Sequence, residues 1–177
     1  MSTYLLAFVI GDLHRISATT RSGVEVSMYA TTNHHTSTLA FSLDIAIRAI
    51  DFFEKYFNIP YPLKKSDHVA VPDFSAGAME NWGLITYRER VLLVDEKTAQ
   101  TTKELVASVI CHELSHQWFG NLVTMKWWDD LWLNESFANM MEYVAVDALE
   151  PSWNIWQHFA SHETAVALSR DHISGVQ

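Results

Sequence analysis

His112, Glu113 and His116 form an HExxH pattern inside a stretch with helical character. Histidines four residues apart lie on one face of a helix, close enough for both imidazoles to bind a single metal ion. Zinc suits such donors because it accepts nitrogen and oxygen ligands in a tetrahedron, and a catalytic site leaves the fourth position to water. Glu113 stands where a general base can reach that water without being a ligand. The pattern therefore predicts one Zn2+ per chain and metal-assisted hydrolysis.

Glu135 is the candidate for the third metal ligand. Eighteen residues separate it from His116, and it lies near the start of the next helical stretch. If the two helices pack together, its carboxylate points back at both histidines, and this HExxH-x18-E spacing is typical of gluzincin peptidases. His158 and His162 are also four residues apart, but Phe159 occupies the place of a catalytic glutamate and no third ligand follows at a useful distance. We interpret that pair as surface or structural histidines.

The ligands also need neighbours that hold them in place. Zinc-bound imidazoles usually donate their second N–H to a carboxylate or carbonyl, and Asp129 and Asp130 are the nearest candidates between the two ligand-bearing stretches. Acidic residues before a helix also stabilise its N-terminus, so Asp129 and Asp130 could have this structural role instead of accepting from a histidine. Cys111, directly before His112, is interpreted as a packed thiol. Four tryptophans around the same connection predict packing that shields and stiffens the site, namely Trp118, Trp127, Trp128 and Trp132.

The elements that position these residues come in the order strands first, helices after. This order indicates an α+β fold in which a small sheet packs on a helical layer, because a doubly wound sheet would need alternating strands and helices. Runs of apolar and β-branched residues between turn signals predict the strands, and apolar side chains recurring every three or four residues predict the helices. The expected strands are 4–10, 15–20, 24–29, 68–71, 84–87 and 91–94; the expected helices are one capped by Thr36 or Ser37 and ending before Ile59, then 101–121, 131–149 and 152–170.

The bulk composition narrows the possible partners. The 177 residues are 49% hydrophobic, which is enough for one domain with an apolar core. The formal net charge of -9 argues against nucleic acid and anionic membranes, since both are bound by a basic face. No apolar run approaches the length that spans a bilayer, and the N-terminal run lacks the features of a signal peptide. We expect no nucleic-acid or membrane partner and a cytoplasmic location.

A second motif lies upstream of the metal pattern. Residues 77–81 read Gly-Ala-Met-Glu-Asn, which alone would indicate only a polar turn. With this loop placed before the HExxH-x18-E set, and with the segments 87–89, 116–124 and 127–135 around them, the chain resembles the M1 aminopeptidases. The resemblance covers nearly the whole chain, and residues 123–147 look most similar to members from lactic-acid and related Gram-positive bacteria.

The resemblance implies a thermolysin-like catalytic core that releases single N-terminal residues from peptides with a free N-terminus. It implies that Glu80 binds the substrate's ammonium group, for which a partly buried carboxylate is a natural partner. It also implies that the backbone of Gly77 and Ala78, with Met79 beside them, lies along the substrate. Glycine at position 77 lets that backbone approach the peptide without a side chain in the way.

The resemblance further implies that part of the catalytic apparatus lies outside these residues. Residues 1–31 would be strands leading in from an N-terminal β-domain, and residues 32–177 a thermolysin-like zinc peptidase domain truncated at its C-terminal end. The family's oxyanion-stabilising tyrosine is not identifiable, because Tyr143 does not match it, and neither is the amine-anchoring residue of the preceding domain. We therefore expect low activity from the chain alone, and self-association through surface that truncation exposes.

Two other functions stay open on the sequence. One is a segment that binds zinc but does not hydrolyse substrate, and the lack of an identifiable oxyanion-stabilising tyrosine and second amine anchor favours this function. The other is a family member with epoxide hydrolase activity on a lipid, which the composition does not exclude.

Overall fold

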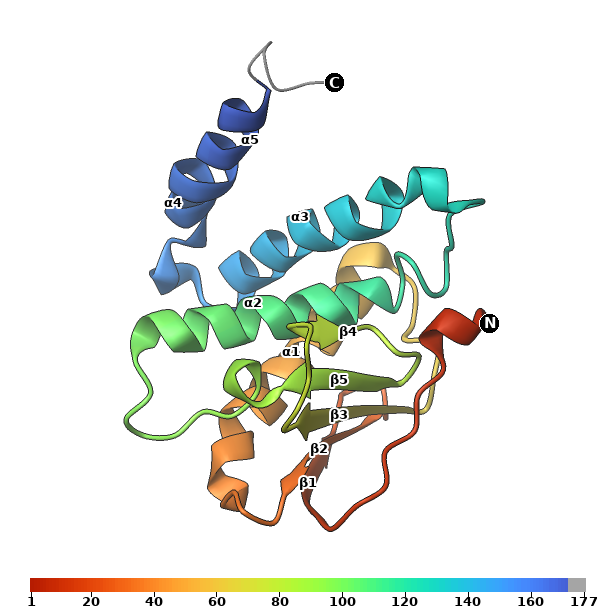
Figure 1. The fold of residues 1–177 in the computed structure, drawn as a ribbon, viewed down its shortest axis with the longest axis vertical. Helices are drawn as coiled ribbons and strands as arrows, with labels where there is room; N and C mark the ends of the chain where they lie inside the picture. Colours follow the sequence, from red (N-terminus) through yellow and green to blue (C-terminus); the bar gives the residue numbers. More distant parts are fainter. Residues whose placement is uncertain (172–177) are drawn as a thin grey trace.

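A computed structural model describes residues 1–171 of the chain. A five-stranded mixed sheet, in the order β1-β2-β3-β5-β4, packs against a group of helices (Figure 1). The strands are β1 (Leu13–Thr19), β2 (Glu25–Thr31), β3 (Lys65–Val71), β4 (Ala78–Met79) and β5 (Leu84–Arg88). The helices are α1 (Ala40–Phe57), α2 (Gln100–His116), α3 (Trp132–Leu149), α4 (Ile155–His158) and α5 (Thr164–Arg170). The expected α+β class, with a small sheet on a helical layer, is confirmed.

The sheet combines both pairing directions. β1 pairs antiparallel with β2, while β2, β3 and β5 run parallel to one another. The chain crosses from β2 to β3 through α1, as a parallel pair requires. β4 pairs antiparallel with β5 and forms the last strand at that end of the sheet. Because β2 pairs with β3, the sheet runs across the domain boundary expected after residue 31, and that boundary stays a prediction.

α1 is the amphipathic helix that its sequence predicts. Its inward face is fully buried at Ile45, Ala49, Ile50 and Phe53. A 3-10 turn over Thr36–Leu39 leads into it, and it ends where Asn58 takes a left-handed conformation with a φ of 53°. α1 and α2 enclose the core together with the sheet, and α3 runs beside α2 (Figure 1). This stack fixes α2, which carries the HExxH pattern.

The N-terminal apolar run is not the strand expected over residues 4–10. Thr3–Leu5 forms a 3-10 turn, and residues 6–10 run as irregular chain in which Phe8 and Ile10 are exposed. A strand needs a partner edge, and this run finds none within residues 1–171. Instead, Leu5 is buried and its carbonyl accepts the Trp82 N–H at 3.1 Å, which ties the segment to the loop before β5.

Other boundaries differ from expectation in the second half of the chain. Residues 91–94 are not a strand: Glu89–Val91 is a 3-10 turn, and the apolar side chains that follow fill the core from a loop. α2 ends at His116, five residues early, because residues 117–124 fold back in tight turns. The helix expected over 152–170 is broken into a 3-10 turn (Pro151–Trp153), α4, a π-helical turn (Phe159–Glu163) and α5. Among the described residues, no helix has the length and apolar character to cross a membrane.

Candidate metal centre

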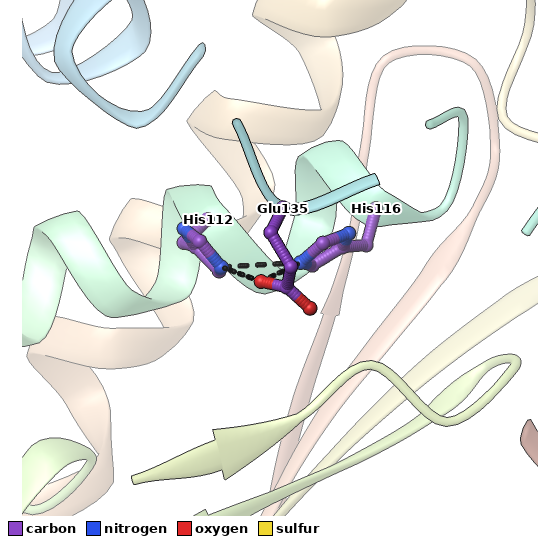
Figure 2. A group of neighbouring side chains, drawn as sticks. All are labelled: His112, His116 and Glu135. Atoms are coloured by element: carbon purple, nitrogen blue, oxygen red, sulfur yellow. Dashed lines mark hydrogen bonds and ion pairs between the residues drawn. The ribbon is translucent and has the colours of Figure 1, made fainter. Parts of the chain in front are cut away.

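α2 and α3 bring the three expected ligands to one point. The Nε2 atoms of His112 and His116 lie 3.1 Å apart, and the Glu135 Oε2 atom lies 3.5 Å and 3.7 Å from them (Figure 2). The histidines meet because they are four residues apart on α2, and Glu135 reaches them because the first turns of α3 lie against the end of α2. The structure thus brings together the three side chains that the sequence singles out as candidate ligands.

The histidine tautomers make this point a site for a cation. His116 Nδ1 donates to the Phe119 carbonyl at 3.0 Å, and His112 Nδ1 donates to the Glu142 carboxylate at 2.8 Å. With both Nδ1 atoms engaged as donors, the two Nε2 lone pairs face each other and a carboxylate oxygen. Such a convergence of acceptors is repulsive unless a cation lies among them, and two imidazoles with one carboxylate are donors that zinc prefers. The residues therefore fit the metal.

The pKa values of the same three side chains in the ion-free protein also indicate a site for a cation. Burial lowers the pKa of His112, but hydrogen bonds to Glu135 and Glu142 outweigh it and raise the value to about 10. Burial and the neighbouring His112 charge lower the pKa of His116, and the His112 hydrogen bond lowers the pKa of Glu135. A proton on His112 thus takes the place that a metal ion would occupy.

Glu142 is the supporting residue that sequence reasoning missed. Asp129 and Asp130 were the expected acceptors, but they form part of a 3-10 turn (Trp128–Asp130) and make no hydrogen bond to either histidine. A signal existed: Glu142 follows Glu135 by seven residues, two turns of helix, so both side chains lie on the face of α3 that meets α2.

Glu113 lies in the environment of a general base. Only 6% of its surface is exposed, and its Oε2 atom has no hydrogen-bond partner within residues 1–171. Burial raises its pKa to about 8, and the nearby carboxylates of Glu80, Glu135 and Glu142 add to the rise. A divalent cation at the adjacent ligands would counter both effects. A buried carboxylate beside a metal, with a free oxygen, can accept a proton from water.

The loop over 77–81 brings a second buried carboxylate to the same place. Glu80 is 4% exposed, and carboxylate oxygens of Glu80 and Glu113 and a ring nitrogen of His116 lie within 4.8 Å of one another. Before it, Ala78 and Met79 form β4, while Gly77 is exposed, and a Cβ there would meet nothing within 4 Å. The chain itself therefore does not require glycine at position 77.

Tyr4 is a further neighbour of Glu80 that the sequence did not reveal. Its ring packs edge-on against Trp128, and partial burial together with the Glu80 carboxylate raises its pKa. The 3-10 turn at the start of the chain thus reaches the candidate metal centre. No sequence signal pointed to this, because Tyr4 sits in an apolar run that has the pattern of a strand.

The remaining candidates lie outside the centre. His158 and His162 are exposed and line a cavity of about 320 Å³ that Glu142 also borders, away from the three converging side chains. Cys111 is a buried free thiol whose pKa burial raises, as a packed side chain should be. Tyr143 donates to Glu163 at 3.4 Å, beside that same cavity.

Only one of the four tryptophans behaves as expected. Trp118 is buried against the aromatic rings of Phe53 and Phe57. Trp127, Trp128 and Trp132 are 65%, 48% and 59% exposed, so the expected shielding by all four is wrong for Trp127 and Trp132, while the Trp128 ring packs on that of Tyr4.

Comparison of the sequence with known proteins points to one family. A family model described as the peptidase family M1 domain matches residues 41–177. Aminopeptidase N of Lactococcus lactis subsp. lactis (strain IL1403) is 62% identical over 178 residues, covering 100% of this chain and 21% of that protein. Aminopeptidase N of Lactobacillus delbrueckii subsp. lactis is 58% identical, with the same coverage. The puromycin-sensitive aminopeptidase of Caenorhabditis elegans is 52% identical over 172 residues, covering 97% of this chain and 18% of that protein.

These matches confirm the resemblance on which the two motifs agreed, including the similarity to proteins of lactic-acid bacteria. The chain spans about a fifth of the length of these relatives. The family match covers α1 to α5 and all of the converging side chains except Tyr4. The chain belongs to peptidase family M1.

Proposed function

We propose that this chain forms the core of a zinc aminopeptidase, which hydrolyses the first peptide bond of substrates with a free N-terminus. The observation that carries the proposal is the position of Glu80, a buried carboxylate within 4.8 Å of the Glu113 and His116 donor atoms. A substrate ammonium bound there lies one residue from the reacting bond. The relatives that the chain matches are named aminopeptidases.

Each residue then has a distinct task. His112, His116 and Glu135 would hold the zinc, which when bound supplies Lewis acidity at the scissile carbonyl and lowers the pKa of water. Glu113 accepts a proton from the attacking water and delivers it to the leaving amine. Its burial favours the protonated form, which is the form that must donate in the second step.

The edge of the sheet provides a place for the rest of the peptide. Within the described chain, β4 pairs with β5 on one side only, so its other edge keeps free backbone groups. An extended peptide can add to such an edge through main-chain hydrogen bonds. The backbone of Gly77 and Ala78 and the Met79 side chain would thus lie along the substrate, with Glu80 at its amino end.

The test compares a free and a blocked N-terminus in a full-length protein that carries this segment. We expect an amino-acid amide to be hydrolysed and its N-acetylated form to be spared. Replacing Glu80 with alanine should reduce kcat/KM for the free amine by at least about tenfold while zinc content stays unchanged, since a buried charge-assisted bond is lost. Equal cleavage of free and acetylated substrates by the parent would rule out an aminopeptidase and indicate an endopeptidase.

A further inference from the structure

Asn134 links the proposed amine anchor to the metal ligands. It directly precedes Glu135 at the start of α3 and is 3% exposed. Its side-chain Nδ2 donates to the Glu80 Oε1 atom at 3.4 Å. Within residues 1–171, Asn134 is the amide donor to the Glu80 carboxylate, and Tyr4 is its second polar neighbour.

Gly120 provides the space into which the Asn134 amide packs. Gly120 has a φ of +117°, and a Cβ there would lie 2.0 Å from Asn134 Oδ1 and 2.7 Å from its Cγ. The amide therefore packs directly on the Gly120 backbone, and its oxygen has no hydrogen-bond partner in the described chain. The opposite orientation would set the amide oxygen against the Glu80 carboxylate, an unfavourable contact between two acceptors.

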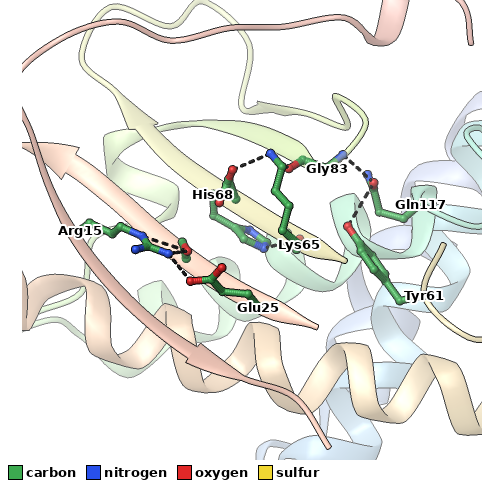
Figure 3. Close-up of polar contacts among 10 residues, drawn as sticks. Arg15, Glu25, Tyr61, Lys65, His68, Gly83 and Gln117 are labelled. Carbon is green, nitrogen blue, oxygen red and sulfur yellow. Dashed lines mark hydrogen bonds and ion pairs between the residues drawn. The ribbon is translucent and has the colours of Figure 1, made fainter. Parts of the chain in front are cut away.

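The main chain around Glu80 is held by other residues. The Glu80 backbone carbonyl accepts hydrogen bonds from Asn121 Nδ2 at 2.8 Å and from Gln117 Nε2 at 3.2 Å. The Gln117 amide oxygen in turn accepts the Gly83 N–H at 3.2 Å and faces the Tyr61 hydroxyl at 3.5 Å (Figure 3). These contacts fix the loop on the end of α2 but do not involve the Glu80 carboxylate, whose neighbours are Asn134 and Tyr4.

We propose that Asn134 is a positioning residue for recognition of the substrate's ammonium group. Asn134 orients the Glu80 carboxylate through its hydrogen bond. Because Asn134 directly precedes the proposed metal ligand Glu135, the Glu80 carboxylate and the metal keep a fixed separation. The inference rests on the proposed aminopeptidase function and deepens it. Asn134 acts through Glu80 and does not itself contact the substrate.

The test measures binding of two metal-chelating probes to the zinc-loaded full-length protein. Leucine hydroxamate carries the free amine, and 4-methylpentanoyl hydroxamate has the same skeleton without it. We expect the parent to prefer leucine hydroxamate, and Asn134→Ala to reduce that preference about tenfold, as the loss of one bond to a charged group predicts. Asn134→Asp keeps the shape but removes the donor, so it should lose the preference at least as fully. Asn139→Ala, on the same helix, is the matched control.

Kinetics separates positioning from a packing role. In both Asn134 variants, the loss should appear mainly as a raised KM for amino-acid amides, with zinc content equal to the parent. A side chain needed only for its shape would tolerate aspartate, so parent-like preference in Asn134→Asp would overturn the inference. If the parent bound both hydroxamates equally, the aminopeptidase function itself would be wrong, and the inference would fall with it. A discriminating parent with unaltered Asn134 variants would overturn the inference alone.

Discussion

Removing the Glu142 carboxylate should weaken zinc binding without touching a ligand. The His112 Nδ1 to Glu142 Oε2 hydrogen bond is 2.8 Å long, and the Glu142 side chain is 14% exposed, so water cannot fully replace it. Loss of such an outer acceptor usually costs 10- to 100-fold in metal affinity, which corresponds to about 1.4–2.7 kcal/mol. We expect Glu142→Ala to fall in this range.

Glu142→Gln separates charge from geometry. Its amide oxygen can still accept from His112 Nδ1, but the bond is no longer charge-assisted, and such bonds are roughly twice as strong as neutral ones. About half of the free-energy loss should therefore remain, or roughly a 3- to 10-fold weaker affinity. Glu104→Gln changes a carboxylate that lines the same cavity as Glu142 without contacting His112, and it should bind zinc like the parent.

The assay is competition for zinc against a chelator of known affinity at constant pH, with circular dichroism to confirm that each variant is folded. If Glu142→Ala fails to fold, Glu142→Gln carries the comparison. Zinc dissociation constants within about twofold of the parent for both variants would refute the idea that Glu142 supports the metal through His112.

Four further outcomes are expected at the same centre. Glu113→Gln should keep its zinc but lose 10²- to 10⁴-fold in kcat/KM, measured at equal zinc occupancy, and a loss below about tenfold would assign the base to another group. Because the pKa of His112 is raised to about 10 in the ion-free protein, zinc must displace a proton from this residue. The apparent affinity for zinc should therefore rise about tenfold per pH unit between pH 7 and 9. Calorimetry in buffers of different ionisation enthalpy should detect the released proton, and a zinc affinity that does not change with pH would contradict this prediction. The same raised pKa stabilises the ion-free fold below pH 6.5, and that contribution is lost as the pH rises towards 10. Gly120→Ala should lower the free energy of unfolding by about 1–3 kcal/mol in denaturant titration, because the new Cβ would clash with Asn134. Gly11→Ala is the control and should be near neutral, since a Cβ there meets nothing within 4 Å. Similar values for both variants would show that the Asn134 side chain moves aside freely.

The proposed metal ligands could be predicted because their geometry is largely local. The spacing of His112 and His116 is a property of a single helix, so the HExxH pattern fixes their relation before any tertiary contact is known. Glu135 required the packing of two helices, which the spacing between the motifs implied. Glu142 obeys the same helical period as Glu135, but it lies two turns further along α3, away from the connection in which the sequence predicts the acceptors.

The second layer of the site could not be predicted, because it depends on contacts between distant segments. Tyr4 and Asn134 reach Glu80 from opposite ends of the chain, and neither lies in a pattern that marks it. The run over 4–10 has the composition of a strand, but pairing needs a neighbouring edge that composition does not reveal. The break of the last helix into α4, a π-helical turn and α5 likewise had no Gly or Pro inside residues 155–170 to announce it.

The ligand set is compact along the chain, and this has a consequence for the order of folding. Glu135 follows His112 by only 23 residues, whereas Trp82 and Leu5 must close a far longer loop to form their hydrogen bond. Short loops cost less entropy to close, so the α2–α3 hairpin can form early and a metal ion can cross-link it before distant strands have paired. The slow step would then be the docking of residues 1–5, which completes the surroundings of Glu80 last. A newly synthesised protein would thus bind its metal before its substrate-binding site is complete.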